Sequence, residues 1–225
     1  MLLTVVDYGV GNLRSIAKAL EKASTQNHLN YSVKVSSDID DIKKADKLVL
    51  PGQGSFKACI IGIESIKGLG DELNESVKIK KKPIYGICAG MQLFGTTGYE
   101  EEETPGLNWI EGDVVKIKPG KENLKIPHMG WNELNLKNSC EVFKNVDEKS
   151  HAYFIHSYEF LPKDKAVVSL STNYGKEIVA AVCNENIYGS QFHPEKSQDT
   201  GIKILTSFLK VWKFYQQSIL KMENV

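Results

Sequence analysis

The stretch Pro83-Ile-Tyr-Gly-Ile-Cys-Ala-Gly-Met-Gln92 decides the fold of this chain. Its first half is an apolar run typical of a buried strand, and helix-forming residues follow from Ala89 to Phe94. The pattern G-x-C-x-G at the junction is the cysteine form of a nucleophile elbow, a sharp strand-to-helix turn. The free N–H groups of a helix start favour a thiolate at Cys88, and the Ala89 N–H points to where an oxyanion would form. We therefore predict that Cys88 is a nucleophile.

Strands and helices alternate on the N-terminal side of this junction. Expected strands are Leu2–Val6, Tyr31–Val35, Lys47–Leu50 and Pro83–Ile87, and expected helices are Leu13–Ala23 after Asn12, Phe56–Ser65 and Asp71–Lys80. Further strands are expected at Val114–Ile117, Tyr153–Ile155, Val167–Leu170, Ile178–Val182 and Ile187–Phe192, with a hairpin turn at Asn184–Asn186 and a last helix at about Gly201–Lys221. Such alternation predicts a parallel sheet covered by helices, to which the hairpin adds antiparallel strands. The prediction is one α/β domain over residues 1–225, a three-layer domain with a mixed, largely parallel central sheet.

The composition excludes several classes of protein. The 225 residues carry 28 Lys plus Arg and 28 Asp plus Glu, so no global positive charge attracts nucleic acid or an anionic membrane. The content of 41% hydrophobic residues is that of a globular protein, and no apolar run is long enough to span a bilayer. The four cysteines form no C-x-x-C pair and fit free thiols in a reducing compartment, so a cytoplasmic location is expected. Cys59, Cys140 and Cys183 are interpreted as buried structural residues.

A thiol nucleophile needs a base, and the best candidate among the five histidines is His193 in Gln191-Phe-His-Pro-Glu-Lys-Ser197. In extended backbone, residues two apart face the same way, so Glu195 can accept a hydrogen bond from the far ring nitrogen of His193 and orient the ring. Pro194 marks a strand end, where α/β enzymes place their sites. Alone, this motif fits a turn histidine beside a solvated glutamate. Together with Cys88 it favours a Cys-His-Glu triad.

The segment Leu50-Pro-Gly-Gln-Gly54 follows an expected strand. It is either an ordinary glycine-rich turn or the source of a second oxyanion N–H, because its glycines permit a positive φ. It is not a phosphate loop, since the pattern G-x-x-x-x-G-K-[ST] is absent from the sequence.

Together, these segments resemble the class I (triad) glutamine amidotransferases, and within that family the glutaminase subunits of imidazole glycerol phosphate synthases. The resemblance runs nearly end to end. It rests on Asp7–Leu13 (DYGVGNL), Leu50–Phe56 (LPGQGSF), Gly86–Gln92 (GICAGMQ), Pro127–Asn132 (PHMGWN), Tyr153–Tyr158 (YFIHSY) and Gln191–Ser197 (QFHPEKS).

The resemblance implies a glutaminase that needs no metal or other cofactor. Cys88 would attack the carboxamide of glutamine, His193 would move the proton, and Glu195 would orient His193. The positions that match the oxyanion hole are Gly52, Gln53 and Ala89, and those that match the glutamine site are Gln92, Glu100, His156, Ser157 and Tyr158. Two residues depart from the family pattern: Gln53 stands where a small apolar residue is usual, and Ala89 stands where leucine is common. Both keep their backbone N–H.

The resemblance also implies a heterodimer. The family pairs with a (β/α)8-barrel cyclase, which receives the ammonia through its barrel and makes imidazole glycerol phosphate and AICAR in histidine biosynthesis. The residues that would face this partner are Asn12, Pro127, Met129 and Trp131. Packing of Met129 and Trp131 in the core is the competing interpretation.

Three other functions compete with this one. The same glutaminase chemistry could feed a sugar-amidating synthetase of a surface-glycan pathway, and the departures at Gln53 and Ala89 keep that alternative open. The chain could instead be a stand-alone cysteine hydrolase acting on γ-glutamyl peptides. A non-catalytic binding protein is disfavoured, because the cysteine, histidine and glutamate of the triad are all present.

Overall fold

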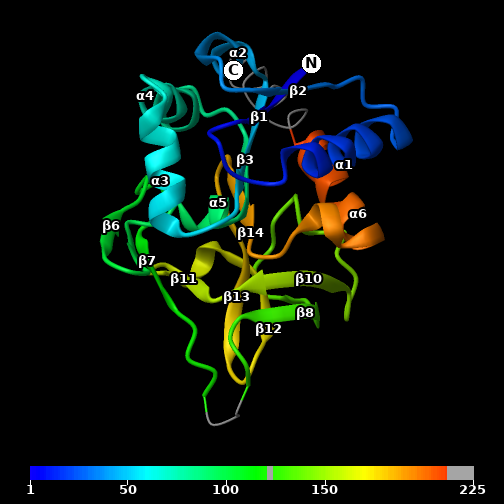
Figure 1. Cartoon of the computed structure of the whole chain (residues 1–225). Coiled ribbons are helices and arrows are strands. Elements are labelled where there is room, and N and C mark those ends of the chain that lie inside the picture. Colours follow the sequence, from blue (N-terminus) through cyan, green and yellow to red (C-terminus); the bar gives the residue numbers. More distant parts are fainter. Residues whose placement is uncertain (121–123, 212–225) are drawn as a thin grey trace, which may run out of the picture.

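The computed structural model, which describes residues 1–120 and 124–211, is built around an eight-stranded sheet (Figure 1). The strands are, in spatial order, β2 (Ser32–Ser36), β1 (Leu2–Val6), β3 (Lys47–Gly52), β4 (Ile84–Cys88), β14 (Ile187–Ser190), β13 (Glu177–Asn184), β12 (Val168–Asn173) and β9 (Asn135–Leu136). From β2 to β14 the neighbours pair in parallel, and from β14 to β9 they pair antiparallel. The prediction of a mixed, largely parallel sheet is therefore confirmed.

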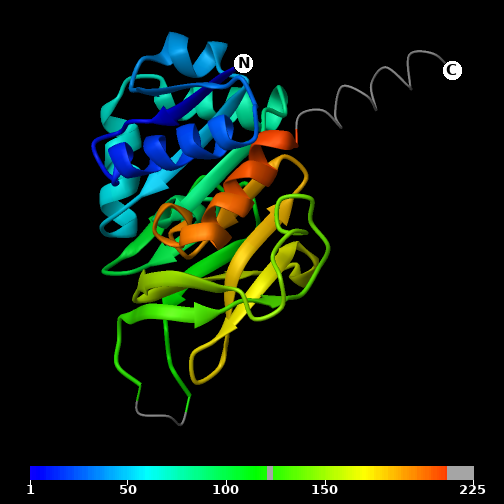
Figure 2. The ribbon, with the colours of Figure 1, turned by 90° about the vertical axis from the view of Figure 1, so that its right-hand side faces the viewer.

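Helices cover both faces of this sheet and complete the three layers (Figures 1 and 2). They are α1 (Leu13–Gln26), α2 (Ile39–Lys44), α3 (Phe56–Ser65), α4 (Leu69–Asn74) with a π-helical extension (Glu75–Ile79), α5 (Ala89–Gln92) and α6 (Gln198–Lys210). Alternate strand residues face different layers, as the pleat requires. Val49 of β3 packs in the core beneath α1 and α6, whereas Leu48 and Leu50 pack in the core beneath α3 and α4. The predicted extension of the last helix through Trp212 to Lys221 lies outside the described residues.

Two smaller sheets lie beside the lower half of the central one in Figure 1. One pairs β8 (His128–Glu133) with β10 (His151–His156), and the other contains β5 (Thr97–Tyr99), β6 (Glu103–Pro105), β7 (Gly112–Lys116) and β11 (Tyr158–Pro162). The strands expected at Val114–Ile117 and Tyr153–Ile155 form, and they belong to these smaller sheets. Strand periodicity gives the conformation of a segment and does not identify its neighbours.

The cysteines differ from the expectation. Cys140, which follows β9, and Cys183, at the end of β13, are paired as a disulfide. The expectation of four free thiols is therefore wrong for these two residues, which only the fold brings together across 43 positions. Cys59 and Cys88 are free. Across residues 1–120 and 124–211, no helix is both long and apolar enough to cross a membrane.

Candidate active site

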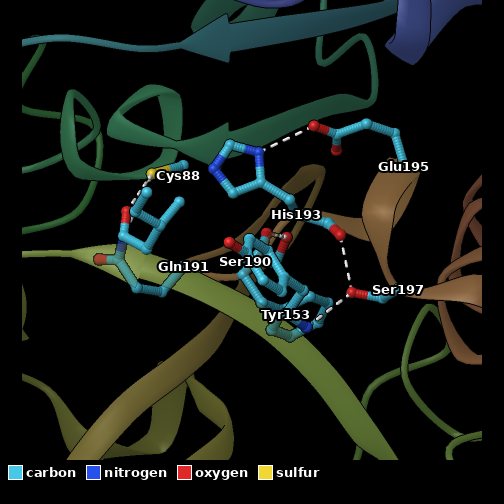
Figure 3. Close-up of polar contacts among 9 residues, drawn as sticks. Cys88, Tyr153, Ser190, Gln191, His193, Glu195 and Ser197 are labelled. Atoms are coloured by element: carbon cyan, nitrogen blue, oxygen red, sulfur yellow. Dashed lines mark hydrogen bonds and ion pairs between the residues drawn. The ribbon is translucent and has the colours of Figure 1, made fainter. Parts of the chain in front are cut away.

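Cys88 stands where β4 turns into α5, as the elbow pattern predicts (Figure 3). Its φ is +56°, a left-handed conformation that is uncommon for a residue with a side chain and frequent at functional turns. The thiol is largely buried, and it lies at the carboxyl edge of the parallel strands. This edge is where open α/β sheets bind their ligands.

His193 lies beside Cys88, and both residues line the same cavity (Figure 3). Its Nδ1 atom is 2.8 Å from Oε1 of Glu195. A carboxylate can only accept, so Nδ1 carries a proton and Nε2 is left to face the sulfur. The backbone of His193 is also fixed: its N–H donates to the Tyr153 carbonyl at 3.0 Å, and the Ser197 hydroxyl donates to the His193 carbonyl at 2.7 Å (Figure 3).

Glu195 reaches His193 by a different backbone route from the expected one. Residues Pro194–Lys196 form a 3-10 turn after β14, so the argument from extended backbone is wrong in its geometry. The contact itself occurs: His193, the extended residue before the turn, reaches Oε1 of Glu195 with its Nδ1 atom. The Glu195 carboxylate is 1% exposed, so its charge acts on His193 with little solvent screening.

Opposing effects set the charge of the His193 ring. Burial disfavours the imidazolium, but the hydrogen bonds and charges of Cys88 and Glu195 outweigh it and raise the pKa of His193 to about 9. A positively charged imidazole beside the sulfur favours the thiolate. The arrangement can therefore hold a nucleophile and a proton donor side by side at neutral pH.

The end of β3 and the two residues after it, Gln53 and Gly54, form another wall of the site. Gly52 pairs with Cys88 in the parallel register, and a Cβ atom at Gly52 would lie 2.1 Å from the Gly90 nitrogen. Only glycine fits there. The Tyr8 hydroxyl donates to the Pro51 carbonyl and so fixes the peptide that carries the Gly52 N–H.

A cavity of about 330 Å³ opens at the sulfur of Cys88. Its lining includes the predicted residues Gly52, Gln53, Cys88, Ala89, Gln92, Glu100, Pro127, His156, Ser157, Tyr158 and His193. This volume is within the range of small-molecule sites. The Glu100 carboxylate accepts a hydrogen bond from the Phe56 N–H at 2.6 Å, which anchors it to the first turn of α3. In the described part of the chain, no cluster of His, Cys, Asp and Glu side chains is arranged to hold a metal ion.

Two further histidines, His156 and His128, are buried at the cavity wall, and His156 lines the cavity. His156 Nδ1 donates to the Tyr158 carbonyl at 2.8 Å, so its Nε2 accepts from His128 Nδ1 at 2.9 Å. The Asn132 amide in turn lies 3.1 Å from His128 Nε2. With no carboxylate in this chain of hydrogen bonds, burial lowers the pKa of His128 to about 4 and that of His156 to about 3.

The ribbon formed by β8 and β10 presents an apolar outer face. Met129 and Trp131 are 58% and 48% exposed, and the residues paired with them across the ribbon are Ile155 and Tyr153. Core packing of Met129 and Trp131 is therefore wrong. Asn12, another predicted interface residue, is exposed at the start of α1.

Three residues of the site were missed by the sequence analysis. Gln191 is fully buried, and its Nε2 atom lies 3.6 Å from the sulfur of Cys88. Ile155 and Lys196 line the cavity, and the Lys196 ammonium lies over the Tyr153 ring, 5.8 Å from its centre. Gln191 and Lys196 flank the triad histidine in the same short motif, which is the signal that could have identified them.

Comparisons with known proteins agree with this geometry. A family model described as glutamine amidotransferase class-I matches residues 4–212. The imidazole glycerol phosphate synthase subunit HisH of Pelagibacter ubique is 46% identical over 211 residues, which are 94% of this chain and 100% of the relative. The protein of the same name from Bradyrhizobium diazoefficiens is 44% identical over 216 residues, with 95% and 100% covered.

Solved structures share the fold at lower identity. A putative GMP synthase protein from Thermoplasma acidophilum has a TM-score of 0.70 at 20% identity, with 98% of both chains covered. The glutaminase domain of Trypanosoma brucei CTPS has a TM-score of 0.64 at 15% identity, with 93% of this chain and 94% of that one covered. By its family match and by these relatives, the chain belongs to the class I glutamine amidotransferases.

Proposed function

We propose that this protein is the glutaminase subunit of an imidazole glycerol phosphate synthase, which hydrolyses glutamine and passes the ammonia to a (β/α)8-barrel cyclase in histidine biosynthesis. Relatives at 46% and 44% identity carry that subunit's name over nearly the whole chain. The observation that carries the chemistry is that Cys88 and His193 line one cavity, while the buried Glu195 carboxylate contacts the His193 ring. Thiol, imidazole and carboxylate are the groups that acyl transfer from an amide requires.

The first half-reaction forms a thioester. The Cys88 sulfur attacks the side-chain carbonyl carbon of glutamine, a C–S bond forms, and the carbonyl π pair moves to oxygen. The backbone N–H groups around Gly52, Gln53 and Ala89 stabilise this oxyanion. When the intermediate collapses, the C–N bond breaks, and the nitrogen takes the proton from His193 Nε2 and leaves as ammonia.

The second half-reaction releases glutamate. A water molecule attacks the γ-glutamyl thioester while His193 Nε2 removes its proton. Collapse then breaks the C–S bond and returns the thiolate to Cys88. Glu195 is a positioning residue in both halves: it holds the His193 ring and stabilises the imidazolium through the 2.8 Å contact.

Polar groups on the cavity wall can bind the rest of the substrate. One oxygen of the Glu100 carboxylate is held by the Phe56 N–H, and the carboxylate can still attract the α-ammonium group of glutamine. Both N–H bonds of Gln92 are used inside the protein, on the Tyr158 carbonyl and on Gln191 Oε1, so Gln92 offers its carbonyl oxygen. His156, Ser157 and Tyr158 form the facing wall.

The cyclase docks on the apolar outer face of the β8–β10 ribbon. Pro127 and Ile155 line the cavity, and Ile155 is paired with the exposed Met129. The cavity and the apolar face are therefore adjacent, so ammonia released at Cys88 has a short path to a partner bound there. Exposed Met and Trp side chains are typical of the centre of a protein interface.

We also propose that the protein works in the cytoplasm. The nucleophilic thiol of Cys88 must stay reduced to function, and a reducing compartment favours this. The Cys140–Cys183 disulfide, a bond that is rare in that compartment, is the observation against this location. Fractionation of cells that express the protein tests this location.

The test of the proposed function compares two nitrogen sources in the complex with a cyclase. Cys88→Ala should abolish glutamine-dependent synthesis and leave synthesis driven by ammonium salts unchanged, because only ammonia production uses the thiol. Glutamine-dependent turnover that survives in this variant would show that Cys88 is not the nucleophile. Glutamine hydrolysis by the isolated chain that a cyclase and its ligand do not change would contradict the proposed partner.

A further inference from the structure

We infer that Gln191 is a further catalytic residue, whose side-chain N–H donates a hydrogen bond to the sulfur of Cys88 and stabilises the thiolate. The inference rests on the proposed function, since it assigns a role at the same thiol. It deepens that function by naming a group outside the triad that contacts the reacting atom.

The fold places Gln191 next to Cys88. In the parallel pair β14–β4, Ser190 stands opposite Ile87, so the following residues, Gln191 and Cys88, are level at the ends of neighbouring strands. The Gln191 backbone N–H donates to the Ala180 carbonyl at 2.8 Å, which continues the pairing with β13. The side chain is fully buried and points at the thiol, with Nε2 3.6 Å from the sulfur (Figure 3).

The hydrogen-bond network determines which end of the Gln191 amide faces the sulfur. The Tyr158 carbonyl can only accept, so the group of Gln92 that lies 3.0 Å from it must be the NH2 group. The second N–H of that group lies 2.9 Å from Gln191, and only the oxygen of Gln191 can accept it. The NH2 group of Gln191 is therefore directed at Cys88.

The Tyr158 carbonyl, which is the first acceptor of this hydrogen-bond network, is itself fixed. His156 Nδ1 donates to it at 2.8 Å, and His156 is held in turn by His128. Neither Gln92 nor Gln191 can rotate its amide by 180° without placing two acceptors or two donors against each other in the buried interior, which is costly. The donor at the sulfur is therefore preorganised.

A donor at this point has a specific use. The Ile155 carbonyl lies 3.9 Å from the sulfur and accepts from the thiol form, so it favours the neutral state. The N–H of Gln191 opposes it, because a hydrogen bond to a charged group favours that group's charged form. Gln191 thus assists twice: it raises the thiolate fraction before attack, and it stabilises the thiolate that leaves when water cleaves the thioester. No bond to Gln191 itself forms or breaks.

The test measures the rate of Cys88 alkylation by iodoacetamide against pH, followed on the Cys88 peptide by mass spectrometry. In Gln191→Leu the midpoint of this profile should rise by about one to two pH units, which is the effect of losing one hydrogen bond to a charged group. Gln191→Glu keeps an oxygen for Gln92. As a carboxylate it has no donor and adds a negative charge beside the sulfur, so its midpoint should rise at least as far. Gln26→Leu, the same change on the exposed face of α1, should leave the profile unchanged.

Each result separates one interpretation from another. A midpoint that stays at the wild-type value in both Gln191 variants would overturn the inference. A rise in Gln191→Leu without a rise in Gln191→Glu would show that Gln191 serves to hold Gln92 rather than to donate to the sulfur. Far-ultraviolet circular dichroism and thermal melts identify a variant that does not fold. If the wild-type complex fails to use glutamine while the midpoints still move as expected, the proposed function fails and the donor role of Gln191 stands.

Discussion

Two groups of buried histidines in this protein have opposite pKa shifts. His193 has its pKa raised to about 9, whereas burial lowers the pKa of His128 to about 4 and that of His156 to about 3. Desolvation disfavours the imidazolium in all three. The difference lies in the partners: His193 contacts a carboxylate and lies beside the Cys88 thiol, and the other two contact each other, an amide and a carbonyl. Burial alone makes a histidine a neutral structural group, and an anionic partner is needed to keep it charged and ready to donate a proton.

The largest expected effect is that of His193→Ala on glutamine turnover. Loss of the group that moves the proton should lower kcat by about 10²–10⁴-fold, the usual contribution of general acid–base catalysis. Steady-state glutamate production by the cyclase complex measures it. His28→Asn, which removes an exposed histidine just after α1, should change the rate little. Equal losses in the two variants would remove the distinction on which the comparison rests.

Glu195→Gln should have a smaller effect, because it leaves the base in place and removes only its anionic partner. The loss of a charge-assisted hydrogen bond of about 1.5–3 kcal/mol corresponds to a fall of about 10- to 100-fold in turnover. The pKa of His193 should fall from about 9, toward the values of the other buried histidines. NMR titration of the ring measures this shift. A greater loss of turnover than in His193→Ala would contradict the roles assigned to the two residues.

Trp131→Ala tests whether the outer face of β8, the strand that also carries His128, binds the cyclase. Because Trp131 is half exposed and meets the Tyr153 ring edge-on at the surface of the ribbon, its removal should weaken cyclase binding by about 10- to 30-fold while the melting temperature changes little. Titration calorimetry with the cyclase measures the first quantity. Unfolding of the isolated variant would place Trp131 in the folding core and away from the interface.

The smallest expected effect is a change in acid stability on replacing His128. In the unfolded chain His128 and His156 bind protons near pH 6.5, whereas in the folded chain they do so only near pH 4 and 3. Between about pH 6.5 and pH 3, the unfolded chain therefore binds more protons than the folded chain. The free energy of unfolding decreases as the pH falls through this range.

His128→Phe should reduce this decrease, because phenylalanine keeps the stacking on Phe154 and Tyr174 and does not titrate. The expected difference between pH 7.5 and pH 5.5 is about 1–2 kcal/mol. Urea unfolding at the two pH values measures it. His28→Asn, at an exposed position with positive φ, is the matched control. An unchanged pH dependence in His128→Phe would show that the buried pair does not set the acid stability.

The sequence predicted the elements whose signals are local. The elbow at Cys88, the strand–helix alternation and the pairing of His193 with Glu195 all depend on short spacings, and they occur in the structure. Contacts between distant segments were missed. Nothing in the spacing of the cysteines links Cys140 to Cys183. The role of Gln191 depends on the register of β14 with β4. The 3-10 turn at Pro194–Lys196 was missed because proline fits both a strand end and the start of such a turn.

The central claim is that Cys88 is the nucleophile of a glutaminase, and covalent labelling tests it most directly. The glutamine analogue diazo-oxo-norleucine is incubated with the cyclase complex at neutral pH, and peptides are analysed by mass spectrometry. The label should be found on the Cys88 peptide and not on Cys59, whose pKa burial raises to about 11. Equal labelling of the two thiols, or an unlabelled Cys88, would contradict the account.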